Sequence, residues 1–208
     1  VRPIEPAERA AIDELPLDLA GYLAANGIAG LAAHPADNFF ERVMFHPTLN
    51  IAGLTSGYGG PGTKTIIPSR AVAKIDMRLV VDQSADDIWA EFERHVKQHA
   101  PNVVARRLGS MEPSRTPVGD PYVQVIARAV ERATGERPYI SPSSGGSLPD
   151  YAFTRDLGLP LEKVPYANVD EANHAPNENM DLERFYNGIK ISASVYEALA
   201  HHDGNRVR

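Results

Sequence analysis

The stretch AVAKIDMRLVV, residues 71–81, gives the clearest indication of local structure in this chain. Small or apolar residues occupy every second position up to residue 81, and Lys74, Asp76 and Arg78 fall between them. Successive side chains of a strand point to opposite faces of the sheet. The alternation therefore predicts a β-strand with one face in a core and the other in solvent.

The residues around this strand predict an α+β layer, which is a sheet with helices on one face. Residues 49–54 are a short strand candidate, and GYGGPG at residues 57–62 is too rich in glycine for a helix or strand. Residues 103–108 are expected to form a last strand. Ser84 begins a helix that ends near Ala100, because a serine followed by acidic residues caps a first turn. Short amphipathic helices are predicted upstream, over residues 8–15, 17–25 and 37–45.

After Pro117 the pattern changes to alternating helices and strands, which favours a parallel or mixed sheet covered by helices, an α/β arrangement. A helical stripe ends at Gly135, and Asp181 caps a long helix that reaches Leu199. Short strands are expected at residues 139–140 and 161–166. The segment between, residues 113–117, has the composition of a linker, so we predict two units, residues 1–113 and residues 117–208.

Composition limits the classes of function. The 208 residues are 43% hydrophobic and 23% charged, which is typical of a globular protein. The net charge of -6 argues against nucleic acid as a partner, since phosphate binding needs clustered cations. No apolar run has the length of a membrane span, and no signal peptide is evident, so a cytoplasmic location is expected. Without cysteine, any metal site must use His, Asp or Glu. The start at Val1 leads us to expect that the protein's beginning is missing.

Three groups of residues could carry chemistry, and each has an ordinary alternative. His174 lies in a polar loop before the last helix, where it could bind a metal or simply contact solvent. Gly145, Gly146 and Ser147 could hold an anion with backbone N–H groups and a hydroxyl, or form a common turn with Ser147 as a helix cap. Arg78 suits bidentate carboxylate binding, although a surface ion pair is the commoner role of an isolated arginine.

No complete catalytic motif for hydrolysis, nucleotide binding or zinc proteolysis is present. Taken together, however, four segments resemble the metallopeptidase family of aminoacylase, carnosinase and glutamate carboxypeptidase, and they occur in the family's order. These segments begin at Gly57, Lys74, Gly145 and His174, and they read GYGGPGTKTIIP, KIDMRLV, GGSLP and HAPNE. The resemblance runs from about residue 49 to residue 199.

The resemblance implies a partial lid or dimerisation domain, an antiparallel sheet with helices on one face, followed by the C-terminal part of an α/β zinc-peptidase catalytic domain. His174 is similar to the family's last metal ligand. Gly145, Gly146 and Ser147 resemble the loop that holds the substrate's carboxylate, and Arg78 resembles the lid arginine that clamps it. Thr65, which from the residues alone is either ligand-facing or a cap, resembles a lid residue that reaches the neighbouring subunit of a homodimer.

The family's other metal ligands and its general base are not matched, so no catalytic residue is assigned in this chain. The resemblance implies a parent enzyme with two divalent ions, expected to be zinc, that hydrolyses a small peptide or an N-acyl amino acid beside a free carboxylate. The chain alone is expected to bind metal weakly or not at all and to be inactive. The alternative is a non-catalytic dimerisation or ligand-binding module.

Overall fold

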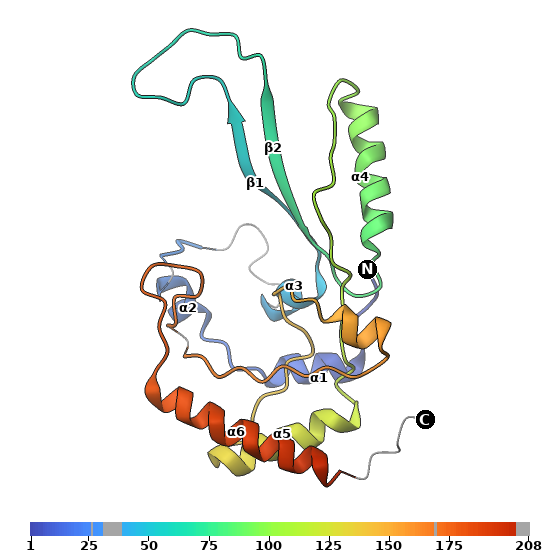
Figure 1. The fold of residues 1–208 in the computed structure, drawn as a ribbon, viewed down its shortest axis with the longest axis vertical. Helices are drawn as coiled ribbons and strands as arrows, with labels where there is room; N and C mark the ends of the chain where they lie inside the picture. The colour runs from blue at the N-terminus through green and yellow to red at the C-terminus, as the bar shows by residue number, and fades with distance from the viewer. Residues whose placement is uncertain (26, 31–38, 169, 203–208) are drawn as a thin grey trace. The chain divides into compact units, whose positions relative to one another are not determined.

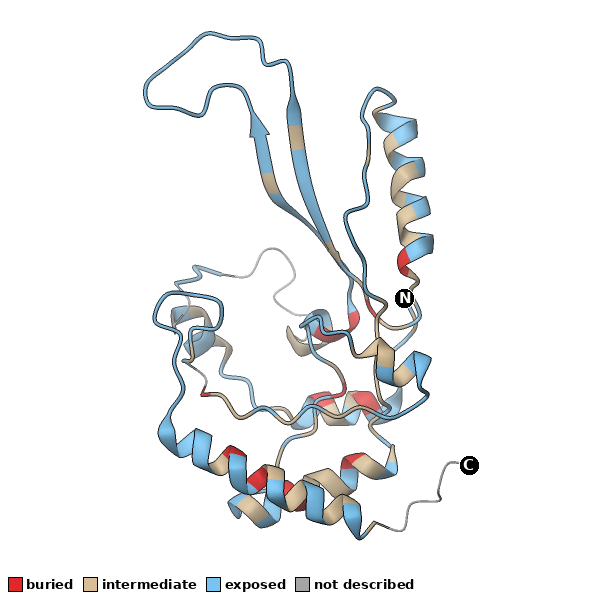
Figure 2. Cartoon of the chain, in the orientation of Figure 1, coloured by how far each residue is buried: buried red, intermediate tan, exposed pale blue. Residues whose placement is uncertain are grey.

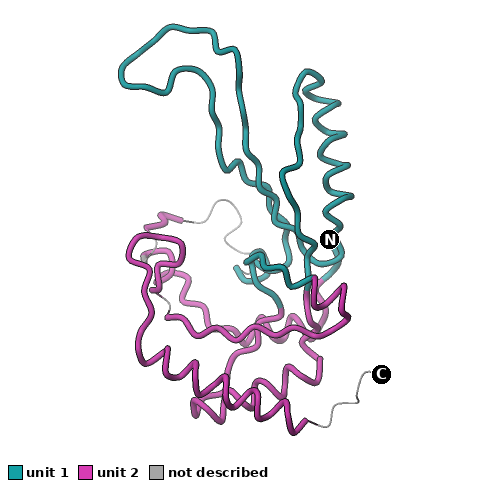
Figure 3. The backbone as a smooth tube through the Cα atoms, in the orientation of Figure 1, with its two compact units in different colours: residues 1–3, 32–114, 143–151 teal, residues 4–31, 115–142, 152–208 magenta. Residues whose placement is uncertain are grey.

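The computed structural model describes residues 1–25, 27–30, 39–168 and 170–202. The chain folds as two compact units, shown in Figure 3. The first unit takes its described residues from the ranges 1–3, 32–114 and 143–151, and the second from 4–31, 115–142 and 152–208. The predicted domain boundary within residues 113–117 refers to the parent fold and stays a prediction.

The first unit contains a two-stranded antiparallel sheet (Figure 1). Strand β1 spans Thr48–Ser56 and strand β2 spans Ala71–Arg78, so both strands lie where the sequence predicts them. The register shifts between Ile51 and Gly53, because Ile51 pairs with Ile75 and Gly53 pairs with Lys74. Ala52 is therefore the extra residue of a β-bulge.

The bulge collects the apolar residues of both strands on one face. The cross-strand pairs are Leu49 with Met77, Ile51 with Ile75 and Leu54 with Ala73. In a regular strand the side chain at position 54 would point to the face opposite that of positions 49 and 51. This face is not buried within the described residues, since Leu49, Ile51 and Leu54 are 57%, 67% and 75% exposed. Figure 2 shows the hairpin as mostly exposed. The prediction that one face of this strand lies in a core is thus wrong for this structure. Alternation identifies the face that can be buried, but it does not show that another layer of the protein covers that face.

Helix α4, Ala85–His99, begins as predicted, with the Ser84 hydroxyl accepting a hydrogen bond from the Asp87 N–H at 3.4 Å. The segment after the helix runs back to its first turn (Figure 1). There Arg107 Nη1 donates to Asp86 Oδ1 at 2.6 Å, and Glu112 accepts from the Ala85 N–H at 3.3 Å. The strand predicted at residues 103–108 is wrong, because this segment is fixed by side chains and joins no ladder in the described sheet.

Helix α3, Phe39–Phe45, is the remaining helix described in the first unit. It buries Met44 and Phe45. The predicted helix began at residue 37, and residues 37–38 lie outside the described residues.

The second unit is helical. Its elements are α1 (Pro6–Glu14), α2 (Leu19–Ala25), α5 (Pro121–Thr134), the single π-helical turn η1 (Ala152–Asp156) and α6 (Leu182–Ala200). Glu8 of α1 is buried and forms an ion pair with Arg115, just before α5. Among the described residues, no helix is both long and apolar enough to cross a membrane.

Helices α5 and α6 form the main packing contact of the second unit. Ala129 of α5 is fully buried, and its carbonyl accepts a hydrogen bond from the Ser194 hydroxyl of α6 at 2.8 Å. Gly188 lets α6 approach the Tyr166 ring, which a Cβ at position 188 would meet at 3.0 Å. Asp120 caps the start of helix α5, and its carboxylate accepts a hydrogen bond from the Tyr122 N–H. Gly135, with φ of 80°, caps the other end of the helix as predicted.

The short strands predicted at residues 139–140 and 161–166 are not formed in the described structure. Leu161 is instead bracketed by Thr116, whose hydroxyl donates to the Leu161 carbonyl at 2.7 Å and accepts from its N–H at 2.8 Å. Apolar composition favours an extended backbone, but a strand also needs a neighbouring strand as hydrogen-bond partner. At Leu161 the Thr116 side chain provides the hydrogen bonds that a neighbouring strand would otherwise form.

Candidate functional site

The structure brings Arg78 and Ser147 together in the first unit. Arg78 ends β2, and its Nη1 donates to Ser147 Oγ at 2.7 Å although the two residues are 69 positions apart. Its Nε donates to Asp76 Oδ1 at 3.0 Å, and both of these side chains are about half exposed. A guanidinium carries five N–H donors, so these bonds orient the group and leave donors for a further acceptor. The arrangement suits a carboxylate, which a guanidinium can bind through two parallel hydrogen bonds.

The glycines beside Ser147 allow the loop to pack closely. A Cβ at Gly145 would lie 3.0 Å from Val43 Cγ1 of helix α3, so a larger residue would force one of them to move. Gly146 is exposed beside Ser144. Ser147 does not cap a helix in this structure, since the helical residues begin at Tyr151. The loop therefore does not present a helix N-terminus at Ser147, and its chemistry rests on Arg78, the Ser147 hydroxyl and backbone groups.

Thr65 lies in the exposed loop between β1 and β2. Within the described residues, no hydrogen bond joins it to Arg78 or Ser147. The same loop is ordered around Tyr58, whose hydroxyl donates to the Pro61 carbonyl at 3.2 Å and whose ring centre is 5.8 Å from Lys64 Nζ. The role of Thr65 toward a neighbouring subunit stays a prediction.

His174 lies in the second unit, in the loop before α6, and its side chain is exposed. Its backbone φ is +60°, and Ala172 and Asn177 also have positive φ, at 55° and 68°. Such values are uncommon outside glycine and cost on the order of 1 kcal/mol or more each. Surrounding interactions must therefore hold the loop in this conformation.

Asn168 anchors the two ends of this loop. It is only 7% exposed, its Nδ2 donates to Asp170 Oδ1 at 2.8 Å and to Asn179 Oδ1 at 3.0 Å, and its Oδ1 accepts from the Asp181 N–H at 3.0 Å. Asn179 in turn donates to the Asn177 carbonyl at 3.0 Å. One buried amide thus joins the start of the His174 loop to the start of α6. Asn168 is not predictable from the sequence, because burial of a polar loop residue leaves no local pattern.

Asp170 is the acidic residue at the start of the His174 loop, and its carboxylate accepts the hydrogen bond from the Asn168 amide. The hydrogen bond from Asn168, with a backbone contribution, lowers the pKa of Asp170. The carboxylate therefore remains ionised to lower pH than usual. A constant negative charge near the His174 loop is compatible with a cation nearby, and it does not require one.

The described residues do not complete a metal site. Among them, no group of three or more His, Asp or Glu side chains is placed to hold a metal ion. Catalytic zinc sites usually have three protein ligands and an open position, and His174 would be one of them. The donor set present therefore does not fit a resident catalytic ion.

Glu162 is an ionisable residue of the second unit that the sequence analysis did not single out. Its Oε1 is buried and has no hydrogen-bond partner in the described structure. Burial, together with the nearby charge of Asp120, raises the pKa of Glu162 to about 7. In the folded state the carboxyl group is therefore partly protonated at neutral pH.

This pKa predicts a pH dependence of stability. The folded pKa lies above the ordinary value of 4.5, so the folded state binds more protons between pH 4.5 and 7 and stability falls as pH rises through that range. Glu162→Gln should then raise the free energy of unfolding at about pH 8 by about 1–2 kcal/mol, a figure reduced for partial solvent exposure, and change it little at about pH 4.

Urea unfolding of both chains at the two pH values measures this difference. The exposed Glu136→Gln is the matched control and should alter neither value. An equal gain for Glu162→Gln at both pH values would show that the ionised state of Glu162 is not the cause.

Comparison with known proteins identifies the class of protein. Residues 10–104 match the family model M20_dimer, described as the peptidase dimerisation domain. The chain therefore carries an M20 peptidase dimerisation domain and is consistent with part of an M20 metallopeptidase. This confirms the family resemblance found in the sequence.

Three of the similar proteins are peptidases. The Cys-Gly metallodipeptidase dug1 of Schizosaccharomyces pombe is 28% identical over 74% of this chain and 34% of its own length. The human Beta-Ala-His dipeptidase is 24% identical over 88% of the chain and 38% of its own length. The crystal structure of an M20 family metallo-carboxypeptidase from Sulfolobus solfataricus superposes with a TM-score of 0.88 at 28% identity, over 95% of this chain and 46% of that one. The chain thus spans less than half the length of these relatives.

Proposed function

We propose that the chain is part of a divalent-metal-dependent hydrolase that cleaves a peptide or amide bond next to a free carboxylate. The observation that carries the proposal is the hydrogen bond from Arg78 to Ser147, which places a cation and a hydroxyl at one point beside a glycine loop. Dipeptides, the substrates named for two of the relatives, end in a carboxylate, and a guanidinium binds that group well. N-acyl amino acids share this group.

In this proposal each matched residue has one role. Arg78 and Ser147 hold the substrate's carboxylate, with the backbone of Gly145 and Gly146 beside them. His174 is one ligand of a site for two divalent ions, expected to be zinc, whose other ligands and general base come from outside this chain. The chain alone is then inactive, and the intact enzyme acts in the cytoplasm.

The test of this function compares a substrate with its C-terminal amide in the intact enzyme and in its Arg78→Ala variant. A hydrolase that recognises the carboxylate should lose its preference for the free acid when Arg78 is removed. The alternative, a dimerisation or ligand-binding module without catalysis, is favoured by the absence of a metal cluster among the described residues. It predicts no turnover by any form of the protein, whatever metal is supplied.

We also propose that the protein forms a homodimer through the matched dimerisation domain. The exposed face containing Leu49, Ile51 and Leu54 lies in that domain and would become partly buried in a dimer. Leu54→Lys should shift the protein toward monomer, since it places a charge on an apolar contact surface. Light scattering on the intact chain, over a range of concentrations, measures the change.

The matched control for the dimer is Lys74→Ala, on the opposite face of the hairpin, which should leave the dimer intact. A monomer for the unmodified chain at high micromolar concentration would contradict the proposed dimer. A stable dimer of the Leu54→Lys variant would instead place the contact elsewhere.

A further inference from the structure

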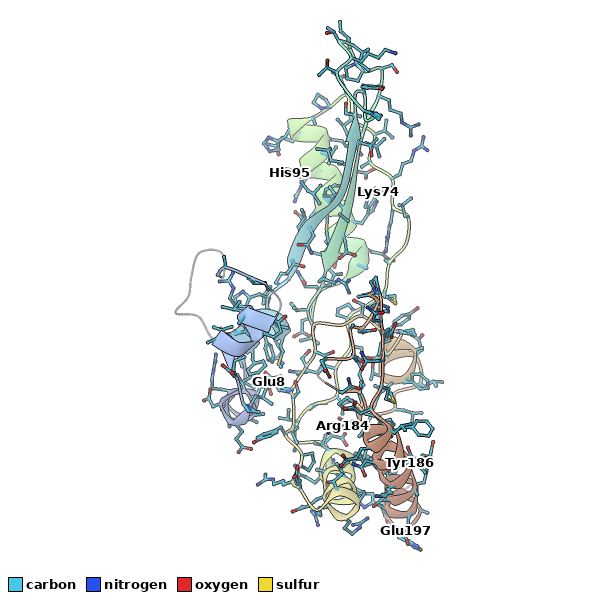
Figure 4. All side chains as sticks on the ribbon, turned by 90° about the vertical axis from the view of Figure 1, so that its left-hand side faces the viewer. Glu8, Lys74, His95, Arg184, Tyr186 and Glu197 are labelled. Atoms are coloured by element: carbon cyan, nitrogen blue, oxygen red, sulfur yellow. The ribbon has the colours of Figure 1, made fainter. Side chains whose placement is uncertain are left out.

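Two histidines of α4 face each other across one helical turn. His95 and His99 are four residues apart, which places them on the same side of the helix. Their ring centres are 4.4 Å apart with an angle of 41° between the ring planes, and both residues are exposed. Figure 4 shows His95 projecting outward from α4. The pair is thus accessible to solvent and already close together.

We propose that His95 and His99 form a binding site for a divalent transition-metal ion, distinct from the role proposed for His174. Two imidazoles at i and i+4 of a helix can bind one ion, as in zinc-binding motifs with this spacing. Metal–nitrogen bonds of about 2 Å bring the two nitrogens within about 3–3.5 Å of each other. Rings with centres 4.4 Å apart reach that separation by side-chain rotation alone.

The surrounding charges also favour a cation. His99 is the last residue of α4, where exposed carbonyl groups and the helix dipole attract positive charge. The two neighbouring cations are paired with carboxylates on the same helix, Arg94 with Glu91 and Lys97 with Glu93 at 3.4 Å. These pairs reduce the repulsion that Arg94 and Lys97 would otherwise exert on a bound ion.

The chemistry of the site selects its occupant. The two histidines bind the ion as neutral imidazoles. Among the described residues no third His, Asp or Glu joins them in a cluster, so water occupies the other coordination positions. Imidazole suits zinc, copper and nickel, and the general order of affinity places Cu²⁺ above Ni²⁺ and Zn²⁺. Mg²⁺ and Ca²⁺ prefer oxygen ligands and should not compete.

The experiment adds Cu²⁺ to the 208-residue chain and follows the backbone amide NMR signals, which broaden near a bound paramagnetic ion. Broadening should centre on residues 95–99. Isothermal titration should show that His95→Ala and His99→Ala each weaken binding by about tenfold or more, since loss of a supporting outer-shell group alone costs about that much. Both side chains are exposed, so the variants should fold normally, as circular dichroism can verify.

A register control separates the pair from the mere presence of histidines. The double variant Lys97→His with His99→Ala keeps two histidines on α4 but places them two residues apart, on different sides of the helix. It should bind as weakly as His99→Ala. The exposed His46→Ala is the matched single control and should bind normally. Unchanged affinity in both His95→Ala and His99→Ala, or broadening centred on His201 and His202, would overturn the site.

Discussion

Replacing Arg78 with alanine in the intact enzyme should lower kcat/KM for a carboxylate substrate by about thirtyfold or more. The variant loses a charge-assisted contact worth on the order of 2 kcal/mol when it is partly desolvated. The reaction with the C-terminal amide of the same substrate should change little, because the amide does not use the ionic part of the contact. The ratio of the two kcat/KM values is therefore the informative measurement.

Two further variants make this result specific. Arg78→Lys keeps the charge but not the planar fork, so it should fall between the unmodified enzyme and the alanine variant. Arg70→Ala removes an exposed arginine from the neighbouring loop and should leave the ratio unchanged. If Arg78→Ala discriminates acid from amide as well as the unmodified enzyme does, the arginine is a structural partner of Asp76 and Ser147 only.

Replacing Asn168 with alanine should lower the free energy of unfolding by about 2–3 kcal/mol. The change removes three hydrogen bonds of a buried side chain and leaves the Asp181 N–H and the Asn179 amide oxygen without that partner. The positive-φ conformation at His174 would lose its support. Hydrogen exchange should become faster at the Ala175 and Asn179 amides, which are bonded within the loop.

Urea unfolding measures the stability, and two variants test the cause. Asn187→Ala removes an amide that accepts a 3.3 Å hydrogen bond from Lys190 on the surface of α6, so it should cost well under 1 kcal/mol. Asn168→Asp can still accept from the Asp181 N–H but cannot donate, and it adds a charge beside Asp170. It should therefore be destabilising as well. A fully stable Asn168→Ala chain would mean that backbone turns alone hold the loop.

The sequence predicted the elements better than it predicted their surroundings. Alternation located β2, the Ser84 cap located the start of α4, and an apolar stripe ended by Gly135 located α5, because these signals act within a few residues. The strands predicted at residues 103–108 and 161–166 are not formed, because the structure of these segments depends on residues distant in the sequence, such as Asp86 and Thr116. Local sequence carries no information about whether a second strand is available.

The residues of the candidate site also differ in how far the sequence predicts them. The family motifs selected Arg78 and Ser147, and the structure places their side chains in contact, although the role of that contact is still a proposal. Asn168 and the His95–His99 pair carry no family motif. Asn168 could be recognised only from its burial in the structure. The i, i+4 spacing of the two histidines is visible in the sequence, and the structure adds the distance between their rings.

The extra residue in β1 affects how related sequences should be aligned. Ala52 shifts the pairing register of β1 by one residue. Leu49, Ile51 and Leu54 therefore correspond to apolar residues that are spaced strictly by two in a relative without the bulge. A correct alignment with such a relative has a one-residue gap in the middle of the strand. Alignment methods that confine gaps to loops would move the gap toward residues 57–62 and pair every later residue of β1 with a residue from the opposite face.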